Sequence, residues 1–168
     1  MDPRVRATVG TMMAARGLTD EEGFFCSDAQ RILVVYVEKL SVAQLRDQVL
    51  MVADSGVTGL LFVTSVLPGA VMRQAIAESA VVVAIEVFAQ IDLVFDIMTH
   101  ELVPSFEVLS DAAKRDLLAK YKIRITQMPR ILMKDPCVRY LNLQRGAVVK
   151  IIRQPADAEE YATYRVVV

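Results

Sequence analysis

Histidine is almost absent from this chain of 168 residues, in which His100 is the single example. The stretch THELVP, at residues 99–104, begins like the helical HExxH motif, where two histidines four positions apart bind one zinc ion. Pro104 stands where that motif requires its second histidine. The zinc-protease hypothesis is therefore excluded, and His100 is expected to have a structural role.

Other sequence signatures of catalysis and phosphate binding are also missing. No serine lies in a GxSxG motif, and neither GxxxxGK[ST] nor GxGxxG occurs. A Ser-His-Asp or Cys-His site would need His100 as its base. None of the six lysines has Asp or Glu two residues upstream, the spacing with which nuclease-like folds share a metal with a phosphate. We expect a non-catalytic protein with no cofactor and no metal, although these motifs do not address a site built from carboxylates alone.

Cysteines and long apolar runs are scarce as well. Cys26 and Cys137 lie far apart, with no CxxC spacing, which fits a reducing compartment. The most apolar stretch, residues 80–95, is interrupted by two carboxylates and a glutamine, and residues 1–4 are unlike a signal peptide. The sequence predicts a soluble intracellular protein with no membrane partner and no small-molecule substrate.

Apolar residues are plentiful, at 54% of the chain, which is enough for one domain or two small ones. The net charge of -1 conceals an asymmetry. Residues 1–99 carry 7 Lys and Arg against 12 Asp and Glu (−5), whereas residues 100–168 carry 12 against 8 (+4). This change of sign favours two units with different partners. We therefore expect domains at 1–98 and 99–168.

The first domain alternates between helix and strand patterns, which predicts an α/β unit with a partly parallel sheet. Ser41 and Gln44 form a capping-box pattern at the start of one helix. We expect helices at 2–17, 41–56 and 68–79, strands at 31–37, 58–65, 80–88 and 91–97, and a polar loop at 18–30.

The second domain has an α+β pattern. Ser110 is the expected N-cap of a helix at 110–121 that buries Leu117, Leu118 and Tyr121. We expect a second, short helix at 136–143, a turn at Gly146, strands at 147–153 and 161–168, and a polar loop at 154–160. Basic side chains are interleaved with tyrosine and aliphatic residues throughout 120–153, which indicates either a solvated face or a binding surface for nucleic acid or an acidic partner.

Six motifs follow one another from His100 to the end of the sequence: HELVP, LLAKYKI, QMPRI, DPCVRYL, RGAVVKIIR and YATYR. This block resembles the C-terminal assembly domain of the fifth-largest subunit shared by eukaryotic RNA polymerases I, II and III, a domain that has an archaeal equivalent. The resemblance implies a nuclear, non-catalytic polymerase subunit that docks on the largest subunit and contacts other subunits. The implied partner-binding residues are His100, Glu101, Pro104, Gln127, Pro129, Arg130, Asp135, Pro136, Arg139, Tyr140, Gly146, Lys150, Arg153, Tyr164 and Arg165.

Residues 56–76 resemble, less closely, part of that subunit's N-terminal jaw domain, an α/β fold of nuclease-like but non-catalytic type. The family's Thr-Pro-Ser-Ala turn faces downstream DNA, and here Leu67, Pro68, Gly69 and Ala70 occupy it. Both hydroxyls are lost, but the helix N-terminus and Arg73 still offer donors to a phosphate. A weak, indirect DNA contact is therefore implied.

Several departures from the family pattern accompany this resemblance. The jaw is shorter, mainly between residues 17 and 31, Phe106 replaces a common histidine, and Asn142 replaces a usual glycine. Such trimming suggests a compact polymerase of a protist or a large DNA virus, in which case a viral factory or virion replaces the nucleus. The alternative is a free-standing module that binds nucleic acid or transcription factors, and a nuclease is the third hypothesis.

Overall fold

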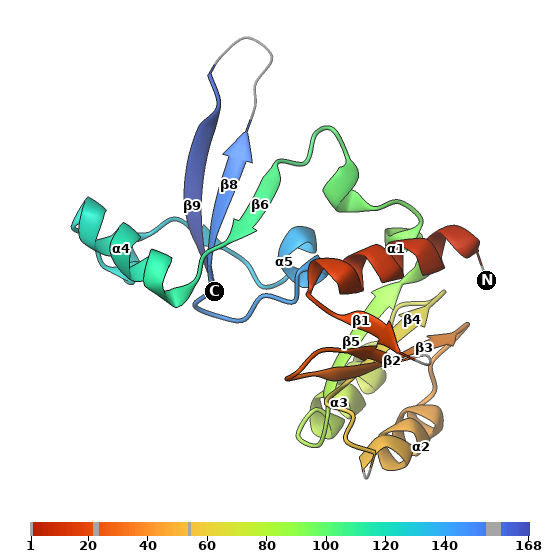
Figure 1. Cartoon of the computed structure of the whole chain (residues 1–168). Helices are drawn as coiled ribbons and strands as arrows, with labels where there is room; N and C mark the ends of the chain where they lie inside the picture. Colours follow the sequence, from red (N-terminus) through yellow and green to blue (C-terminus); the bar gives the residue numbers. More distant parts are fainter. Residues whose placement is uncertain (1, 22–23, 54, 154–158) are drawn as a thin grey trace. The chain divides into compact units, whose positions relative to one another are not determined.

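The computed structural model describes residues 2–21, 24–53, 55–153 and 159–168. It divides into two compact units, Met1–Phe95 and Asp96–Val168. The boundary predicted from the sequence, between residues 98 and 99, lies inside the short 3-10 helix η2 (Ile97–Thr99). It stays a prediction. Figure 1 shows the elements of each unit.

The N-terminal unit is built on a five-stranded sheet of order β1-β2-β3-β4-β5. Its parallel half joins β3 to β4 and β4 to β5, with Val35 opposite Phe62 and Phe62 opposite Val87, which confirms the expected partly parallel sheet. The other half is an antiparallel hairpin attached to β3. The strands are β1 (Thr19–Glu21), β2 (Phe24–Cys26), β3 (Arg31–Val37), β4 (Gly59–Thr64) and β5 (Ala84–Ala89).

Helices cover both faces of this sheet, as Figure 1 shows: α1 lies on one side and α2 and α3 on the other. Because side chains alternate along β4, Leu60 and Phe62 pack with α2 and α3, while their neighbours face away from those helices. All six residues of β4 are buried. The helices are α1 (Pro3–Ala15), α2 (Val42–Ala53) and α3 (Ala70–Ser79).

The local signals at two helix ends are confirmed. The Gln44 backbone N–H donates to Ser41 Oγ at 3.2 Å, and the Ser41 N–H donates to Gln44 Oε1 at 3.0 Å, which is the reciprocal capping box. This capping box begins α2. After the C-terminal end of α1, Gly17 adopts a φ of 77°, a conformation that ends helices and favours glycine.

Two predicted elements of this unit are wrong. Within the predicted loop at 18–30, Thr19–Glu21 and Phe24–Cys26 are antiparallel strands, because pairing with β3 supplies backbone partners that the polar pattern of TDE does not reveal. Residues 91–97 are not a strand: the chain forms the 3-10 helices η1 (Gln90–Leu93) and η2 instead. The Asp96 carboxylate caps η2 by accepting from the Met98 N–H at 3.0 Å, which favours a turn over an extended strand.

The C-terminal unit has a four-stranded sheet of order β6-β8-β9-β7. The long strands β8 and β9 form a hairpin, β6 pairs antiparallel with β8, and the two-residue β7 pairs parallel with the end of β9. The strand bounds are β6 (Ser105–Val108), β7 (Arg130–Ile131), β8 (Val148–Arg153) and β9 (Tyr161–Val167). The remaining elements are α4 (Asp111–Tyr121), η3 (Ile125–Gln127) and α5 (Pro136–Tyr140).

This sheet also has two covered faces. On one face Val148 and Val166 pack with Leu117 of α4 and with Met128, and on the other Val149 and Val167 pack with Val138 of α5. The prediction that Tyr121 is buried is wrong, since 53% of its surface is exposed. Most of the predicted loop at 154–160 lies outside the described residues.

Asn142 has a φ of 50°, the left-handed backbone that its replacement of glycine suggested. We expect Asn142→Gly to keep the stability of this unit and Asn142→Val to lose about 1–2 kcal/mol, because a β-branched side chain is strained in this conformation. Urea unfolding of the two variants measures the difference. Equal stability of both variants would contradict this account of the turn.

Among the described residues, no helix combines the length and the apolar character needed to cross a membrane.

Candidate functional site

The residues predicted to lie near DNA form the connection between β4 and α3. Gly69 is the N-cap of α3 and provides no side-chain cap, and the Arg73 N–H donates to the Gly69 carbonyl at 2.9 Å in the first turn. The Arg73 side chain is exposed. This turn therefore offers backbone donors and one cation, the minimum for a phosphate contact.

The surroundings of this turn are apolar. Val66, Leu67 and Val71 expose 56%, 60% and 76% of their surface. These apolar side chains offer neither charge nor a hydrogen-bond donor to a phosphate. Within this turn Arg73 alone supplies positive charge. The structure thus gives the turn few groups with which to hold DNA.

His100 and Glu101 are exposed at the start of the C-terminal unit, followed by the half-buried Pro104. His100 ends η2, and its Nδ1 accepts a hydrogen bond from the Leu102 N–H at 3.1 Å. This hydrogen bond helps to shape the HELVP turn. Within the described part of the chain no group of three or more His, Cys, Asp or Glu side chains could hold a metal ion.

The DPCVRY motif forms α5. The Asp135 carboxylate accepts from the Cys137 N–H at 2.9 Å, and Pro136 occupies the first helical position. Tyr140 is 3% exposed, so it belongs to the core, while Arg139 is half-buried. Burial, and then the charge of Asp135, raises the pKa of the Cys137 thiol, which keeps it protonated. Helix α5 neighbours η2, which brings the HELVP and DPCVRY motifs together.

A second group of predicted residues surrounds a groove of about 380 Å³ beside β9. Pro129, Tyr164 and Arg165 line it, and the exposed Gln127 and Arg130 adjoin Pro129 in sequence. Gln127 has a structural task, since its Oε1 accepts from the Arg124 N–H at 2.8 Å. The remaining lining is apolar or small: Leu117, Tyr121, Ile123, Met128, Ala162 and Thr163.

Lys150 lies on the same sheet face as Tyr164, directly opposite it in the β8–β9 ladder. Its ammonium donates to Glu107 of β6 at 3.0 Å, and this hydrogen bond raises the pKa of Lys150. Arg153 is exposed at the far end of β8, opposite Tyr161. Gly146 turns the chain with a φ of 87°, and its carbonyl accepts from Lys114 Nζ at 2.8 Å. The predicted residues therefore do not form one cluster.

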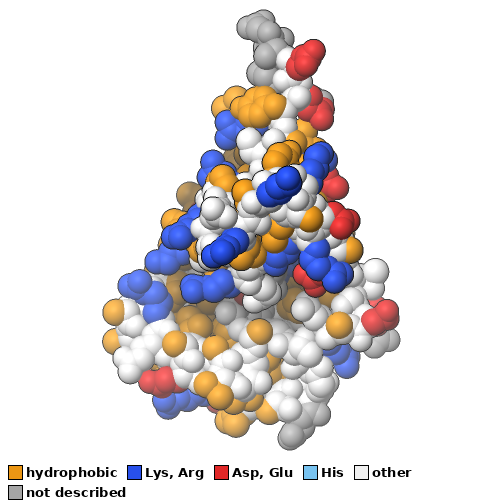
Figure 2. Space-filling view, turned by 90° about the vertical axis from the view of Figure 1, so that its left-hand side faces the viewer, with side chains coloured by type: hydrophobic (Ala, Val, Ile, Leu, Met, Phe, Trp, Pro, Cys, Tyr) orange, Lys and Arg blue, Asp and Glu red, His pale blue; other side chains and the backbone are white. Residues whose placement is uncertain are grey.

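Basic side chains outnumber acidic ones by 12 to 8 in residues 100–168. Figure 2 views the molecule from the side on which α4 lies in Figure 1, and it shows Lys and Arg side chains interspersed with apolar ones.

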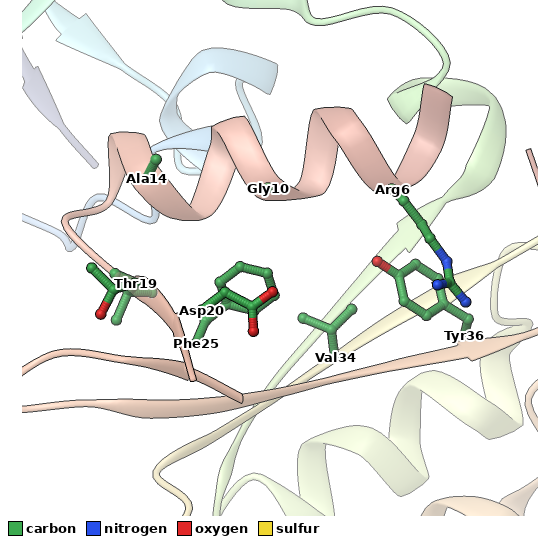
Figure 3. Close-up of a pocket in the computed structure, with 9 residues that line it drawn as sticks. Arg6, Gly10, Ala14, Thr19, Asp20, Phe25, Val34 and Tyr36 are labelled. Carbon is green, nitrogen blue, oxygen red and sulfur yellow. The ribbon is translucent and has the colours of Figure 1, made fainter. Parts of the chain in front are cut away.

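Two features of the N-terminal unit were missed at the sequence level. Arg16 forms a bidentate ion pair with Glu86, with both N–O distances at 2.8 Å, and the side chain of Arg16 is only 4% exposed. A cavity of about 620 Å³ lies between α1 and the sheet (Figure 3), lined in part by Gly10, Phe25 and Tyr36. No sequence signal joins these positions, because their neighbours along the chain carry no shared motif.

The chemistry of this cavity is limited. Figure 3 shows Arg6 of α1 beside the ring of Tyr36, and the guanidinium carbon lies 5.4 Å from the ring centroid. Burial raises the pKa of Tyr36, although the nearby Arg6 acts in the opposite direction. Asp20 and Thr19 are its other polar side chains. Among the described residues that line the cavity, none is a histidine or a cysteine.

Comparison with known proteins assigns the family. Residues 95–167 match the family described as "RNA polymerase Rpb5, C-terminal domain". The chain is 40% identical over 140 residues to "DNA-directed RNA polymerase subunit 5-like protein 1" of Arabidopsis thaliana, covering 82% of this chain and 67% of that protein. It is 44% identical over 105 residues to "DNA-directed RNA polymerases I, II, and III subunit RPABC1" of Caenorhabditis elegans and of Caenorhabditis briggsae, covering 62% of this chain and 49% of each nematode protein.

The matched segment thus spans about two thirds of the plant relative and about half of each nematode relative. The family match coincides with the C-terminal unit, Asp96–Val168, and the longer alignment to the plant protein extends beyond it. These relatives are named as subunits of transcribing polymerases, not as separate enzymes. The chain belongs to the family of the fifth subunit of DNA-directed RNA polymerases.

Proposed function

We propose that this protein is a non-catalytic subunit of a multisubunit DNA-directed RNA polymerase, and that it docks on the largest subunit through residues 99–168. The observation that carries this proposal is the coincidence of the matched residues, 95–167, with a compact unit that has its own core and a basic, partly apolar surface. Because the named relatives serve eukaryotic polymerases I, II and III, the proposed location is the nucleus, or a viral factory for a virus-encoded chain.

The proposed docking residues divide by exposure. His100, Glu101, Pro129, Arg130, Pro136, Arg153 and Arg165 are exposed and would contact the partner directly. The buried Tyr140, the capping Asp135 and the turn-forming Gly146 would shape the surface from within. Truncating the exposed arginines should therefore weaken docking without unfolding the unit, because exposed side chains contribute little to stability.

Affinity purification of the full chain from its native cells tests the main proposal. Co-purification with the largest polymerase subunit at high salt is expected, because apolar contacts of an assembled subunit persist when charges are screened. A stable monomeric pool with no polymerase subunit attached would overturn it.

The N-terminal unit is proposed to be a shortened jaw that lies beside downstream duplex DNA. Its support is the position of the exposed Arg73 in the first turn of α3, whose N-cap Gly69 leaves the backbone donors uncapped by a side chain. The exposed apolar residues around this turn favour a weak contact.

Charge reversal at Arg73 tests the DNA contact. We expect Arg73→Glu to lower photocrosslinking of the assembled polymerase to downstream DNA by roughly two- to fivefold, the effect of losing about 0.5–1 kcal/mol at an exposed charge pair. Arg46→Glu, at an exposed position of α2, is the matched control and should leave the crosslink unchanged. Equal crosslinking by wild type and Arg73→Glu would show that this turn does not reach DNA.

A further inference from the structure

The outer edge of β9, the side away from β8, is only partly paired with another strand of this chain. Strand β8 pairs with β9 from Tyr161 to Val166, whereas β7 pairs only with Val166 and Val167. The Val166 N–H donates outward to the Pro129 carbonyl at 2.9 Å, and the Val167 N–H donates toward β8, to Ala147, at 2.9 Å. Since successive N–H groups of a strand alternate in direction, those of Ala162 and Tyr164 point outward with that of Val166.

Pro129 is the physical reason why the pairing stops. In the parallel ladder between β7 and β9, the next hydrogen bond would run from the N–H of residue 129 to the Tyr164 carbonyl, but proline has no N–H. Within the described residues no strand therefore pairs with β9 between Tyr161 and Arg165 on this side. An unpaired strand edge of this kind is a template for another strand.

The apolar groove of about 380 Å³ lies directly beside this edge, since Ala162, Thr163 and Tyr164 are part of its lining. Tyr121 and Tyr164 both line it and contact each other as a tilted aromatic pair, with ring centroids 6.4 Å apart. The core of the C-terminal unit leaves 53% of the surface of Tyr121 exposed to solvent. A strand added to β9 would direct every second side chain toward these rings.

Positive charge surrounds the groove. No carboxylate lines it. One exposed acidic side chain, Asp116, stands next to a lining residue, whereas five exposed basic side chains stand on or next to the lining: Lys120, Lys122, Arg124, Arg130 and Arg165. None of the ion pairs found among the described residues uses any of these five. Lys120 lies with its ammonium 5.8 Å from the centroid of the Tyr121 ring. Charge complementarity therefore selects an acidic occupant.

We infer that the edge of β9 receives an extended acidic segment of another polymerase subunit, added as a strand in line with β7. Its backbone would pair with the outward N–H and C=O groups of Ala162 and Tyr164. An apolar side chain would pack in the groove against the rings of Tyr121 and Tyr164, and flanking Asp or Glu residues would meet the basic rim. This inference rests on the proposed function, because it takes the segment from a polymerase partner.

A proline substitution can remove a backbone donor at the outer edge of β9 without disturbing the pairing of β9 with β8. Ala162→Pro removes an outward N–H and leaves the β8–β9 ladder intact, whereas Val108→Pro does the same on the outer edge of β6, at the opposite side of the sheet. Each variant is expressed as the full tagged chain, and the co-purified polymerase is quantified. We expect about tenfold less polymerase with Ala162→Pro and an unchanged amount with Val108→Pro. Unchanged assembly of a folded Ala162→Pro variant would overturn the inference.

A second variant covers the case in which Ala162→Pro does not fold. The double substitution Lys120→Glu and Arg124→Glu reverses charge at exposed positions, and Lys134→Glu is its matched control. The double variant should lose polymerase more strongly at low salt than at high salt, because the contacts are exposed. Equal recovery of polymerase by the double variant and the control would overturn the inference that the bound segment is acidic.

Hydrogen exchange and crosslinking identify the contact itself. The amides of Ala162 and Tyr164 should be protected only in the assembled polymerase, while those of Thr163 and Arg165, which pair with β8, are protected in the free chain as well. A photocrosslinker at position 121 should capture an extended, Asp- and Glu-containing peptide of another subunit. A basic or helical peptide, or no added protection, would overturn the inference. Failure of the unmodified chain to co-purify with polymerase would instead overturn the proposed function.

Discussion

Replacing Phe62 with alanine is expected to destabilise the N-terminal unit by about 3–5 kcal/mol, because it removes a large side chain from a fully enclosed site. Phe62 is 0% exposed and lies in the core formed by β4 with α2 and α3. Urea unfolding followed by hydrogen exchange of β3, β4 and β5 measures the loss. Wild-type stability of this variant would contradict the packing described here.

The same substitution separates the roles of the two units. The C-terminal unit has its own cores around Val148 and Val149, so exchange in β8 and β9 should change little. If docking depends on residues 99–168, Phe62→Ala should still co-purify with polymerase. Its matched partner, Val149→Asp, places an unpaired carboxylate at a 0% exposed position of the C-terminal unit and should abolish co-purification. Retention of polymerase by Val149→Asp would contradict docking through that unit.

Glu86→Ala is expected to cost the N-terminal unit about 3 kcal/mol, because it leaves the enclosed guanidinium of Arg16 without its carboxylate. The side chain of Arg16 is 4% exposed and that of Glu86 is 25% exposed, so the expected loss lies at the lower end for buried pairs. Thermal and urea unfolding of the variant measure it.

The control is the double variant Arg16→Met with Glu86→Leu, which removes both charges together. It should recover most of the lost stability, since apolar residues of similar volume replace a buried ion pair at little cost. A double variant less stable than Glu86→Ala would contradict this explanation of the loss.

Local structure was predictable wherever its cause lies within a few residues. The capping box of Ser41 and Gln44 and the N-cap of Asp135 involve groups two or three positions apart, so their sequence patterns contain the whole interaction. Gly146 marked a turn for the same reason, because the conformational preference belongs to the residue itself, whereas the predicted helix at 136–143 ends earlier, at Tyr140, before the left-handed Asn142. The polymerase motifs likewise identified Pro129, Tyr164 and Arg165, which line one groove.

Tertiary structure alone decided the features whose partners are distant in the chain. The polar strand β1 exists because β2 pairs with β3, and Arg16 finds its carboxylate 70 residues away. Tyr121 has the spacing of a buried helical residue, yet it lines an open groove, because the pairing of β7 with β9 stops at Pro129 and leaves the edge of β9 open. A sequence pattern records which side chains prefer burial and which backbones prefer a turn. Which strand edge stays unpaired depends on how all the other strands of the unit pair with one another.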